Sequence, residues 1–272
     1  MSQSLARGLD ILLRLGAEGQ TLDELAADLG VHKTTVLRLL RTLESERFVR
    51  HDSAHRYYLG SRLFALASDS LSHLDVRDRA RPHLRDLSNR VGGQTVHLAA
   101  LENDTVVYID KVESTHSIRM YSRIGLTAAT HCTAVGKVLI GALLARRRAD
   151  VVAGLDLHPF TRRTITSPDE LLRELETVDR QGWAMDRAEH EDFINCIAAP
   201  VHDADGRVVA AVSVSVPDMI LGAGEVRDLL PKLLGAIAAI DADAAPQAIL
   251  LPPRRGRGRI HTPHPAPPKE SR

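Results

Sequence analysis

Hydroxyl-bearing and cationic side chains between residues 33 and 42 could contact duplex DNA, because such groups meet phosphates and base edges. The group comprises Lys33, Thr34, Thr35, Arg38, Arg41 and Thr42. Apolar residues recur between them at the spacing of one helix face, namely Val36, Leu39, Leu40 and Leu43. We therefore predict a helix from about His32 to Ser45 whose polar face lies against DNA.

The residues just before this segment have the features of a shorter helix. Thr21 and Glu24 match a capping box, in which each side chain bonds the backbone N–H of the other residue. Gly30 ends the helix, because glycine adopts a positive φ at low cost. The apolar stripe between them is Leu22, Leu25, Ala26 and Leu29. Two helices joined by a tight turn predict a helix-turn-helix.

A β-hairpin is predicted to follow the second helix. Residues 48–50 and 56–59 are β-prone runs joined by the polar segment 51–55, which is typical of a wing. Arg56, at the start of the second run, joins the residues expected to contact DNA. The order of these elements predicts a winged helix-turn-helix that binds double-stranded DNA with sequence specificity.

The alternative is a helical hairpin whose charged face is merely solvated, and local charge distinguishes the two. From His32 to Arg62 the chain has seven Lys and Arg against three Asp and Glu, whereas the whole chain has 35 of each. A cationic surface on a neutral protein suits phosphate neutralisation with counterion release. DNA binding is therefore the favoured interpretation.

The composition suits two domains with aliphatic cores. The 272 residues are 44% hydrophobic but only 3% aromatic. The chain has neither a run of eighteen apolar residues nor an apolar signal-peptide core, so we expect a soluble, cytoplasmic protein without membrane contact. Cys132 and Cys196, the two cysteines, are then expected to be reduced thiols.

The second half of the chain mixes helical and period-two patterns, which predicts an α+β domain around an antiparallel sheet. Its expected helices cover residues 76–91, 133–145, 168–181 and 225–240. Its expected strands cover residues 95–101, 105–112, 117–122, 198–201 and 208–216. On the last strand, Ser213 and Ser215 alternate with valines and share one face. This face either lines a pocket for a small polar ligand or is turned to solvent.

These patterns divide the chain into four segments. Residues 1–60 are assigned to the DNA-binding domain, 61–75 to a linker helix and 76–245 to the second domain. Residues 246–272 are rich in proline and arginine, and we expect a disordered basic tail. Apolar residues of the linker, namely Leu63, Leu66 and Leu71, need a partner, for which a second subunit is the natural choice.

With these elements in place, residues 3–243 resemble the isocitrate lyase regulator (IclR) family of bacterial transcription factors. The matching segments are 5–12, 25–40, 56–60, 80–84, 131–137, 164–166 and 196–201. The resemblance implies a winged helix-turn-helix, a linker helix and a C-terminal effector-binding domain of GAF-like fold, in homodimers or homotetramers on a palindromic operator. It also implies a regulator of a catabolic operon, taken here as a repressor, that responds to a small organic or sugar acid.

The resemblance further implies the residues of the effector site. Backbone N–H groups at the helix start, Ala134 and Val135, would hold the ligand carboxylate, as suits a helix N-terminus. The polar lining that matches the family is Asp186, Cys196, Ser213 and Ser215, with Met120 at an apolar wall. The chain departs from the family at 193–195, where Phe-Ile-Asn replaces the Gly-x-Arg of many members.

Two other classes of function have weaker support. Gly136-Lys137 lacks the Ser/Thr and the upstream glycine of a phosphate-binding loop, and Cys196 with His190 matches no nucleophile motif, so we expect neither an enzyme nor a cofactor. A metal- or thiol-responsive DNA-binding regulator that uses Cys196 and His190 is the alternative. The spacing of these candidate ligands matches no compact zinc pattern.

Overall fold

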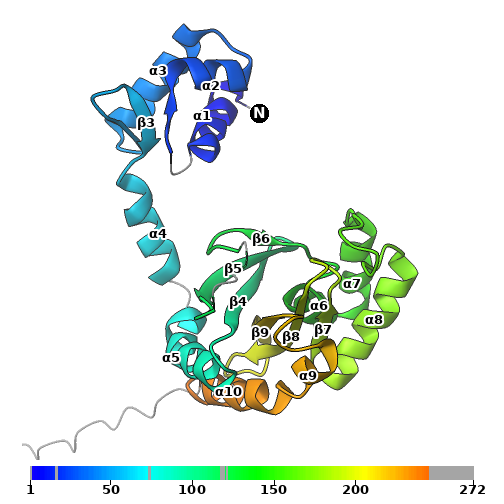
Figure 1. Ribbon diagram of the computed structural model, residues 1–272. Helices are drawn as coiled ribbons and strands as arrows, with labels where there is room; N and C mark the ends of the chain where they lie inside the picture. Colours follow the sequence, from blue (N-terminus) through cyan, green and yellow to red (C-terminus); the bar gives the residue numbers. More distant parts are fainter. Residues whose placement is uncertain (1, 16–17, 73–74, 117–119, 121, 245–272) are drawn as a thin grey trace, which may run out of the picture.

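The computed structural model describes residues 2–15, 18–72, 75–116, 120 and 122–244. Helix α4 joins a mainly helical N-terminal unit to a larger unit built on a sheet (Figure 1). The predicted tail, residues 246–272, lies outside the described residues. Within the described residues, no helix has the length and apolar character needed to cross a membrane.

The N-terminal unit contains three helices, namely α1 (Gln3–Arg14), α2 (Leu22–Leu29) and α3 (Lys33–Ser45). The predicted capping box is present, since Glu24 N donates to Thr21 Oγ1 at 3.3 Å and Thr21 N donates to Glu24 Oε2 at 2.7 Å. Gly30 ends α2 in the left-handed conformation, with a φ of 62°. The apolar stripes of the three helices meet in one small core around Leu25 and Leu40.

A small three-stranded sheet of order β1-β3-β2 completes this unit. Its strands are β1 (Gln20–Thr21), β2 (Val49–His51) and β3 (Arg56–Leu59). The β2–β3 hairpin is the predicted wing, whereas β1 was not expected because a two-residue strand shows no period. Gly60 follows the hairpin, and a Cβ there would overlap Arg47 O, so only glycine allows this close approach.

Helix α4 (Arg62–Ser72) corresponds to the predicted linker helix. Its side chains Phe64 and Leu66 are 76% and 48% exposed, and Leu63 is half-buried. The side chain of Leu71 lies outside the described residues. Exposed apolar side chains on a helix between two units form a surface that another chain could cover.

The second unit contains a six-stranded antiparallel sheet of order β6-β5-β4-β9-β8-β7, which confirms the α+β prediction. Its strands are β4 (Thr95–Glu102), β5 (Thr105–Val112), β6 (Thr127–Ala128), β7 (Ala184–Arg187), β8 (Ile194–His202) and β9 (Val208–Pro217). The strand expected at 117–122 lies mostly outside the described residues; Met120 and Ser122, which are described, are not in a strand. Strands β6 and β7 were not expected.

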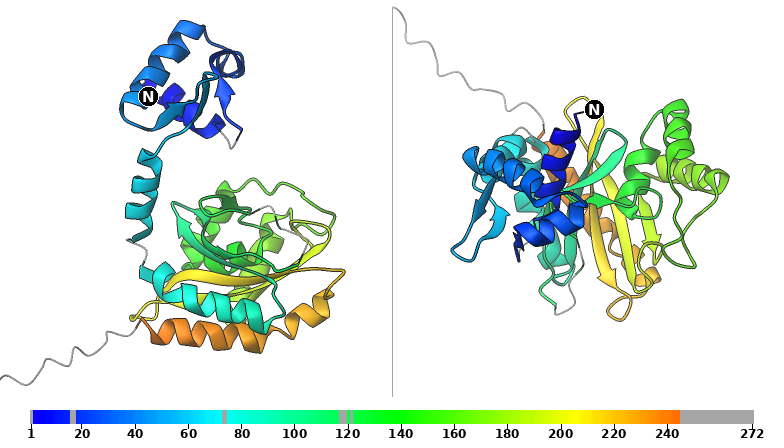
Figure 2. Two further views of the ribbon diagram at one scale, coloured as in Figure 1. Left: turned by 60° about the vertical axis from the view of Figure 1, so that its left-hand side comes forward. Right: turned by 90° about the horizontal axis from the view of Figure 1, so that it is seen from above.

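One face of this sheet carries the main apolar core. Helices α5 (Asp75–Arg90) and α10 (Leu230–Ala242) pack side by side on it (Figure 2). The valines of β9 that alternate with the two serines belong to this core, namely Val212, Val214 and Val216. The alternation therefore assigns the two faces of β9 to different environments.

The opposite face is partly covered by helix α6 (Ala134–Gly141). Ser213 and Ser215 point to this side, and their exposed fractions are 3% and 2%. Of the two alternatives for this face, exposure to solvent is therefore wrong, and the two hydroxyls lie in the protein interior.

Two expected helices differ from those observed. The helix expected at 133–145 ends at Gly141, and α7 (Ala145–Gly154) follows it. The helix expected at 225–240 is divided into α9 (Ala223–Arg227) and α10, because Pro231 lacks an N–H and is tolerated only in the first turn of a helix. Helix α8 (Pro168–Gln181) has the expected bounds, with Ser167 as its N-cap and Gly182 as its C-cap.

Candidate nucleic-acid interface and ligand pocket

The polar face of α3 is open to solvent. Thr34, Arg38 and Arg41 lie at its centre and are exposed, while Thr35 is half-buried. Thr42, also exposed, donates to Arg38 O at 3.2 Å. Among the described residues, neither guanidinium group on this face has an ion-pair partner. Both cations are therefore available for a phosphate or a base edge.

The first turn of α3 carries the remaining predicted contacts. Lys33 Nζ lies 2.7 Å from Asp23 Oδ1, and both side chains are more than half exposed, so this pair is weak and easily exchanged for another anion. Thr34 Oγ1 lies 2.9 Å from Nδ1 of His32, the N-cap of the helix. The N-terminal end of α3 thus presents hydroxyl and cationic groups together.

Arg56, by contrast, is half-buried and bonded within the N-terminal unit. Its Nη2 atom donates to Gly19 O at 2.9 Å and lies 3.4 Å from Glu24 Oε2. These contacts hold the chain around β1 against the wing, and a contact of Arg56 with DNA stays a prediction. Arg50 is a wing cation that sequence alone did not mark; it is exposed and lies 4.6 Å from the Tyr58 ring centre.

The seven residues expected at the effector site surround one cavity on the α6 face of the sheet. They are Met120, Ala134, Val135, Asp186, Cys196, Ser213 and Ser215. Five further residues complete its lining, namely Tyr108, Thr133, His190, Glu191 and Ile194. The free space between these side chains is about 20 Å³, which is room for about one water molecule. A larger ligand therefore requires side chains of the lining to move.

The N-terminus of α6 forms one wall of this cavity. Its N-cap is Thr133, whose Oγ1 accepts from Gly136 N at 3.2 Å and donates to Ala129 O at 2.6 Å. The backbone N–H groups of Ala134 and Val135 have no acceptor among the described residues. Free N–H groups at the positive end of a helix dipole can hold an anion.

Three strands present the polar lining as a row. Ser215 pairs with Cys196, and Cys196 pairs with Asp186, across β9, β8 and β7. Cys196 Sγ donates to Ser215 Oγ at 3.1 Å. Burial raises the pKa of Cys196 well above its ordinary value, so the side chain remains a protonated and unreactive thiol. Among the described residues, no group of three His, Cys, Asp or Glu side chains could hold a metal ion.

Asp186 is the buried carboxyl group of the cavity. Its Oδ1 atom accepts from Glu189 N at 2.7 Å and from His190 N at 3.4 Å. Burial raises the pKa of Asp186 to about 7, although these two backbone bonds and the ammonium group of Lys137 oppose the increase. At neutral pH this carboxyl group can therefore be present in either protonation state.

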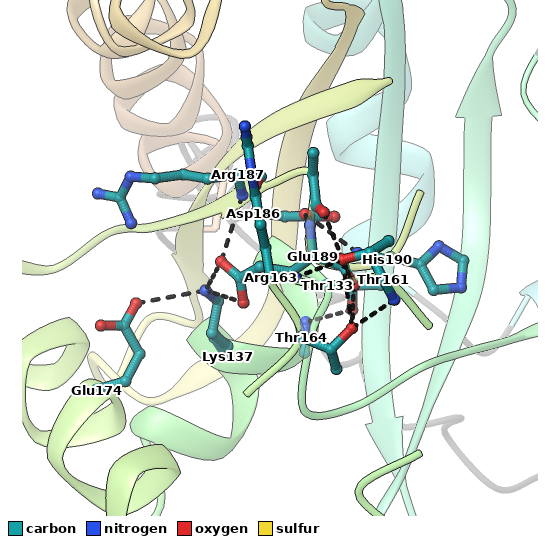
Figure 3. Close-up of polar contacts among 12 residues, drawn as sticks. Thr133, Lys137, Thr161, Arg163, Thr164, Glu174, Asp186, Arg187, Glu189 and His190 are labelled. Atoms are coloured by element: carbon teal, nitrogen blue, oxygen red, sulfur yellow. Dashed lines mark hydrogen bonds and ion pairs between the residues drawn. The ribbon is translucent and has the colours of Figure 1, made fainter. Parts of the chain in front are cut away.

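A buried ion pair supports this wall (Figure 3). Lys137 of α6 is fully buried, and its Nζ lies 2.7 Å from Glu189 Oε1 and 3.3 Å from Glu174 Oε1 of α8. Removing one partner of such a pair leaves a buried charge alone, at a cost of about 3–5 kcal/mol. The sequence did not indicate this ion pair, because Glu189 lies 52 residues from Lys137.

Two threonine hydroxyls hold the same segment from the other side (Figure 3). Thr161 Oγ1 donates to Ala188 O at 2.8 Å, and Thr164 Oγ1 donates to Glu189 O at 2.6 Å. Ala188 is buried and has a φ of 56°, which residues other than glycine rarely adopt. These bonds stabilise the turn that carries Glu189 and His190 to the cavity.

Asn195, the last residue of the segment that departs from the family pattern, faces away from the cavity. Asn195 pairs with Val216, which belongs to the core on the opposite face of the sheet. Its Nδ2 atom donates to Asp218 Oδ1 at 2.8 Å. Asn195 is therefore not part of the lining.

We predict that Asp186→Asn changes how the stability of the second unit depends on pH. The folded-state pKa of Asp186, about 7, lies above the ordinary value of 3.8. The neutral form of Asp186 thus contributes its full stabilisation of the folded state below about pH 4, and this contribution is lost as the pH rises through about 7. Asparagine does not ionise, so between about pH 5 and pH 8 the variant should gain roughly 1–3 kcal/mol relative to the unaltered protein.

Urea titrations followed by the fluorescence of Trp183, the one tryptophan of the chain, measure this gain in the second unit. Asp205→Asn, on the exposed turn between β8 and β9, makes the same chemical change outside the cavity and is the matched control. A stability difference between Asp186→Asn and the unaltered protein that stays constant with pH would contradict the prediction.

Two family models match the chain. The model of the IclR helix-turn-helix domain matches residues 4–53, and the model of the bacterial transcriptional regulator IclR C-terminal domain matches residues 68–242. The chain is 34% identical over 241 residues to the HTH-type transcriptional regulator KdgR of Escherichia coli (strain K12), covering 88% of this chain and 91% of KdgR. It is also 34% identical over 249 residues to the DNA-binding transcriptional repressor YiaJ of that strain, covering 88% and 86%.

A solved structure shares the architecture. An IclR homolog from Microbacterium hydrocarbonoxydans, complexed with 4-hydroxybenzoate, matches with a TM-score of 0.78 at 23% identity, over 89% of this chain and 99% of that chain. This likeness supports the fold, and the two family models together cover most of the sequence in the order of the two units. The chain therefore belongs to the IclR family of bacterial transcriptional regulators.

Proposed function

We propose that this protein is a repressor of a catabolic operon and that a small hydroxy or sugar acid, bound in the cavity at the start of α6, changes its affinity for the operator. One observation carries the proposal: a cavity with free N–H groups at one wall and a buried carboxyl group at another. The family supports DNA binding, and the repressor YiaJ supports the sign of the regulation. We assign no catalytic role to any residue.

The proposed DNA contacts centre on the exposed face of α3. Arg38 and Arg41 are cations without an ion-pair partner among the described residues, and Lys33, Thr34, Thr35 and Thr42 flank them. In a helix-turn-helix, the second helix lies in the major groove with such side chains toward the bases. Arginine can donate two hydrogen bonds to one guanine, which makes Arg38 a candidate for direct base recognition.

We predict that Arg38→Ala weakens operator binding by about 1–3 kcal/mol and relaxes the preference for one base pair, because a bidentate contact is lost. An operator selected from random duplexes, followed by fluorescence anisotropy titrations, measures both effects. Arg207→Ala removes an equal charge from the exposed β8–β9 turn and should leave binding unchanged. Unaltered affinity and base preference in a folded Arg38→Ala protein would rule out this orientation of α3.

The chemistry of the cavity specifies the proposed ligand. A carboxylate would accept from the N–H groups of Ala134 and Val135, near Ser213 and Ser215. An ionised Asp186 repels a second carboxylate, so the ligand should place a hydroxyl group there. In the neighbouring structure the ligand, 4-hydroxybenzoate, carries both groups. Because the free volume of the cavity is small, ligand binding must also displace part of the lining.

We predict that a thermal-shift panel of glycolate, D-glycerate, D-gluconate, D-galacturonate and 4-hydroxybenzoate contains a stabilising acid. Two control compounds should not stabilise the protein: hexanoate, which lacks hydroxyl groups, and D-glucitol, which lacks the carboxylate. The acid should change operator affinity by about 1–3 kcal/mol, and the operator should change the affinity for the acid by the same factor.

In the double variant Ser213→Ala/Ser215→Ala, the response to this acid should be lost, while operator binding without the acid stays intact. Titrations of the operator with and without the acid make the comparison for both proteins. A double variant that responds like the unaltered protein would show that the effector binds elsewhere.

The protein is further proposed to dimerise through α4. We predict that the double change Leu63→Glu/Leu66→Glu raises the dimer dissociation constant by at least about tenfold, because residues three apart share one helix face and two charges would be buried in an apolar interface. Sedimentation analysis measures the constant, and Met219→Glu, at an exposed position elsewhere, is the control. An unaltered protein that is monomeric and protects one asymmetric half-site would contradict both the dimer and the palindromic operator.

A further inference from the structure

A buried histidine lies directly behind the cavity without forming part of its lining. His97 of β4 is 1% exposed and pairs with Ser213 of β9 on one side and with Lys111 of β5 on the other. Its Nε2 atom lies 2.8 Å from Ser122 Oγ, and its Nδ1 atom lies 3.4 Å from Ser215 Oγ. His97 therefore connects a hydroxyl group of the cavity to a hydroxyl group outside it.

The imidazole ring of His97 is neutral. Burial, and to a lesser extent the ammonium group of Lys111, lower the pKa of His97 to about 3. Lys111 is fixed beside it, because its Nζ donates to Met120 O at 3.2 Å and to Ser122 O at 2.9 Å. A neutral ring has one N–H donor and one acceptor nitrogen, so it must donate to one of the two serines and accept from the other.

A β-bulge brings the groups around His97 together. The register between β4 and β5 shifts so that Ile109 is an extra residue of β5. Since side chains alternate along a strand, Tyr108 and Lys111 would otherwise point to opposite faces. With the bulge, both residues reach the cavity face, where the Tyr108 ring centre lies 4.8 Å from that of His97.

Hydrogen-bond accounting selects the tautomer of this ring. The 2.8 Å distance from Ser122 Oγ to His97 Nε2 is the usual length for a hydroxyl donor. Either tautomer leaves one serine hydrogen without an acceptor among the described residues: that of Ser122 if Nε2 carries the proton, and that of Ser215 if Nδ1 carries it. The hydrogen of Ser215 faces the cavity, where a ligand or a water molecule can accept it, and this placement favours a proton on Nδ1, 3.4 Å from Ser215 Oγ.

Ser215 then accepts two hydrogen bonds, from His97 Nδ1 and from the Cys196 thiol. A hydroxyl oxygen has two lone pairs, so only its hydrogen is left, and the cavity is the direction open to it. We propose that His97 is a positioning residue of the effector cavity, which fixes Ser215 as a donor and so selects a ligand carboxylate or carbonyl oxygen at that point. This inference rests on the proposed function of the cavity.

The tautomer can be measured on the full-length protein without ligand, labelled with 15N-histidine. The signals of His97 are those missing from the spectrum of His97→Asn. We expect long-range proton–nitrogen correlations of a protonated Nδ1 and an unprotonated Nε2, unchanged between about pH 6 and pH 8, where an ordinary histidine titrates. A protonated Nε2 with a bare Nδ1, or a ring that titrates in this range, overturns the proposal.

Two conservative variants separate positioning from a purely structural role. The amide nitrogen of asparagine falls near the place of Nδ1, and that of glutamine falls near the place of Nε2. For each acid of the panel that binds the unaltered protein, His97→Gln should weaken binding about tenfold and His97→Asn less than about threefold. Equal losses in the two variants, with Trp183 fluorescence showing both folded, would overturn the positioning role.

The two proposals fail in different ways. A panel in which no acid binds counts against the proposed function, and the tautomer of His97 is still decided by the ligand-free spectra. If an acid binds and changes operator affinity, the proposed function is retained. If Nε2 of His97 is protonated in the same protein, the proposed role of His97 is rejected.

Discussion

The cavity of the second unit depends on the buried ion pair between Lys137 and Glu189. The ammonium group of Lys137 is fully enclosed, and the carboxylates of Glu189 and Glu174 neutralise it. Lys137 lies one turn after the free N–H groups at the start of α6, whereas Glu189 belongs to the segment that follows β7. Separating the two would leave charges buried without partners, so the ion pair holds two walls of the cavity in one fixed arrangement.

The sheet divides stability and recognition between its two faces. On the side of α5 and α10, valines and leucines form the main core, which favours folding without any specific polar geometry. On the side of α6, polar residues lie in adjacent rows across β4, β9, β8 and β7, and hydrogen bonds link His97, Ser215 and Cys196 across three of these strands. In such a buried network one displaced member leaves the others unsatisfied, so a ligand that enters must replace the bonds it breaks.

Features that depend on residues close in sequence could be predicted. The capping box of Thr21 and Glu24 and the left-handed Gly30 involve neighbours within one helical turn, and the alternation on β9 needs only a period of two. The bond between His97 and Ser215 joins residues 118 positions apart, which no local pattern records. Strands of two residues are also too short to show a period. The division of the last helix is different, since Pro231 marks the first turn of α10 and is a local signal in the sequence.

An effector can change operator affinity only if it favours one arrangement of the protein over another. Strand β5 contacts both the cavity wall and the helix that follows the linker. On one face, Lys111 bonds the carbonyl groups of Met120 and Ser122; on the other, Asp110 Oδ2 lies 3.7 Å from Nε of Arg77 on α5. A ligand that displaces Met120 therefore acts on the strand that also holds the start of α5. The change in operator affinity is limited by the difference between the ligand's affinities for the two arrangements. Tight binding without such a displacement would therefore leave the operator affinity unchanged.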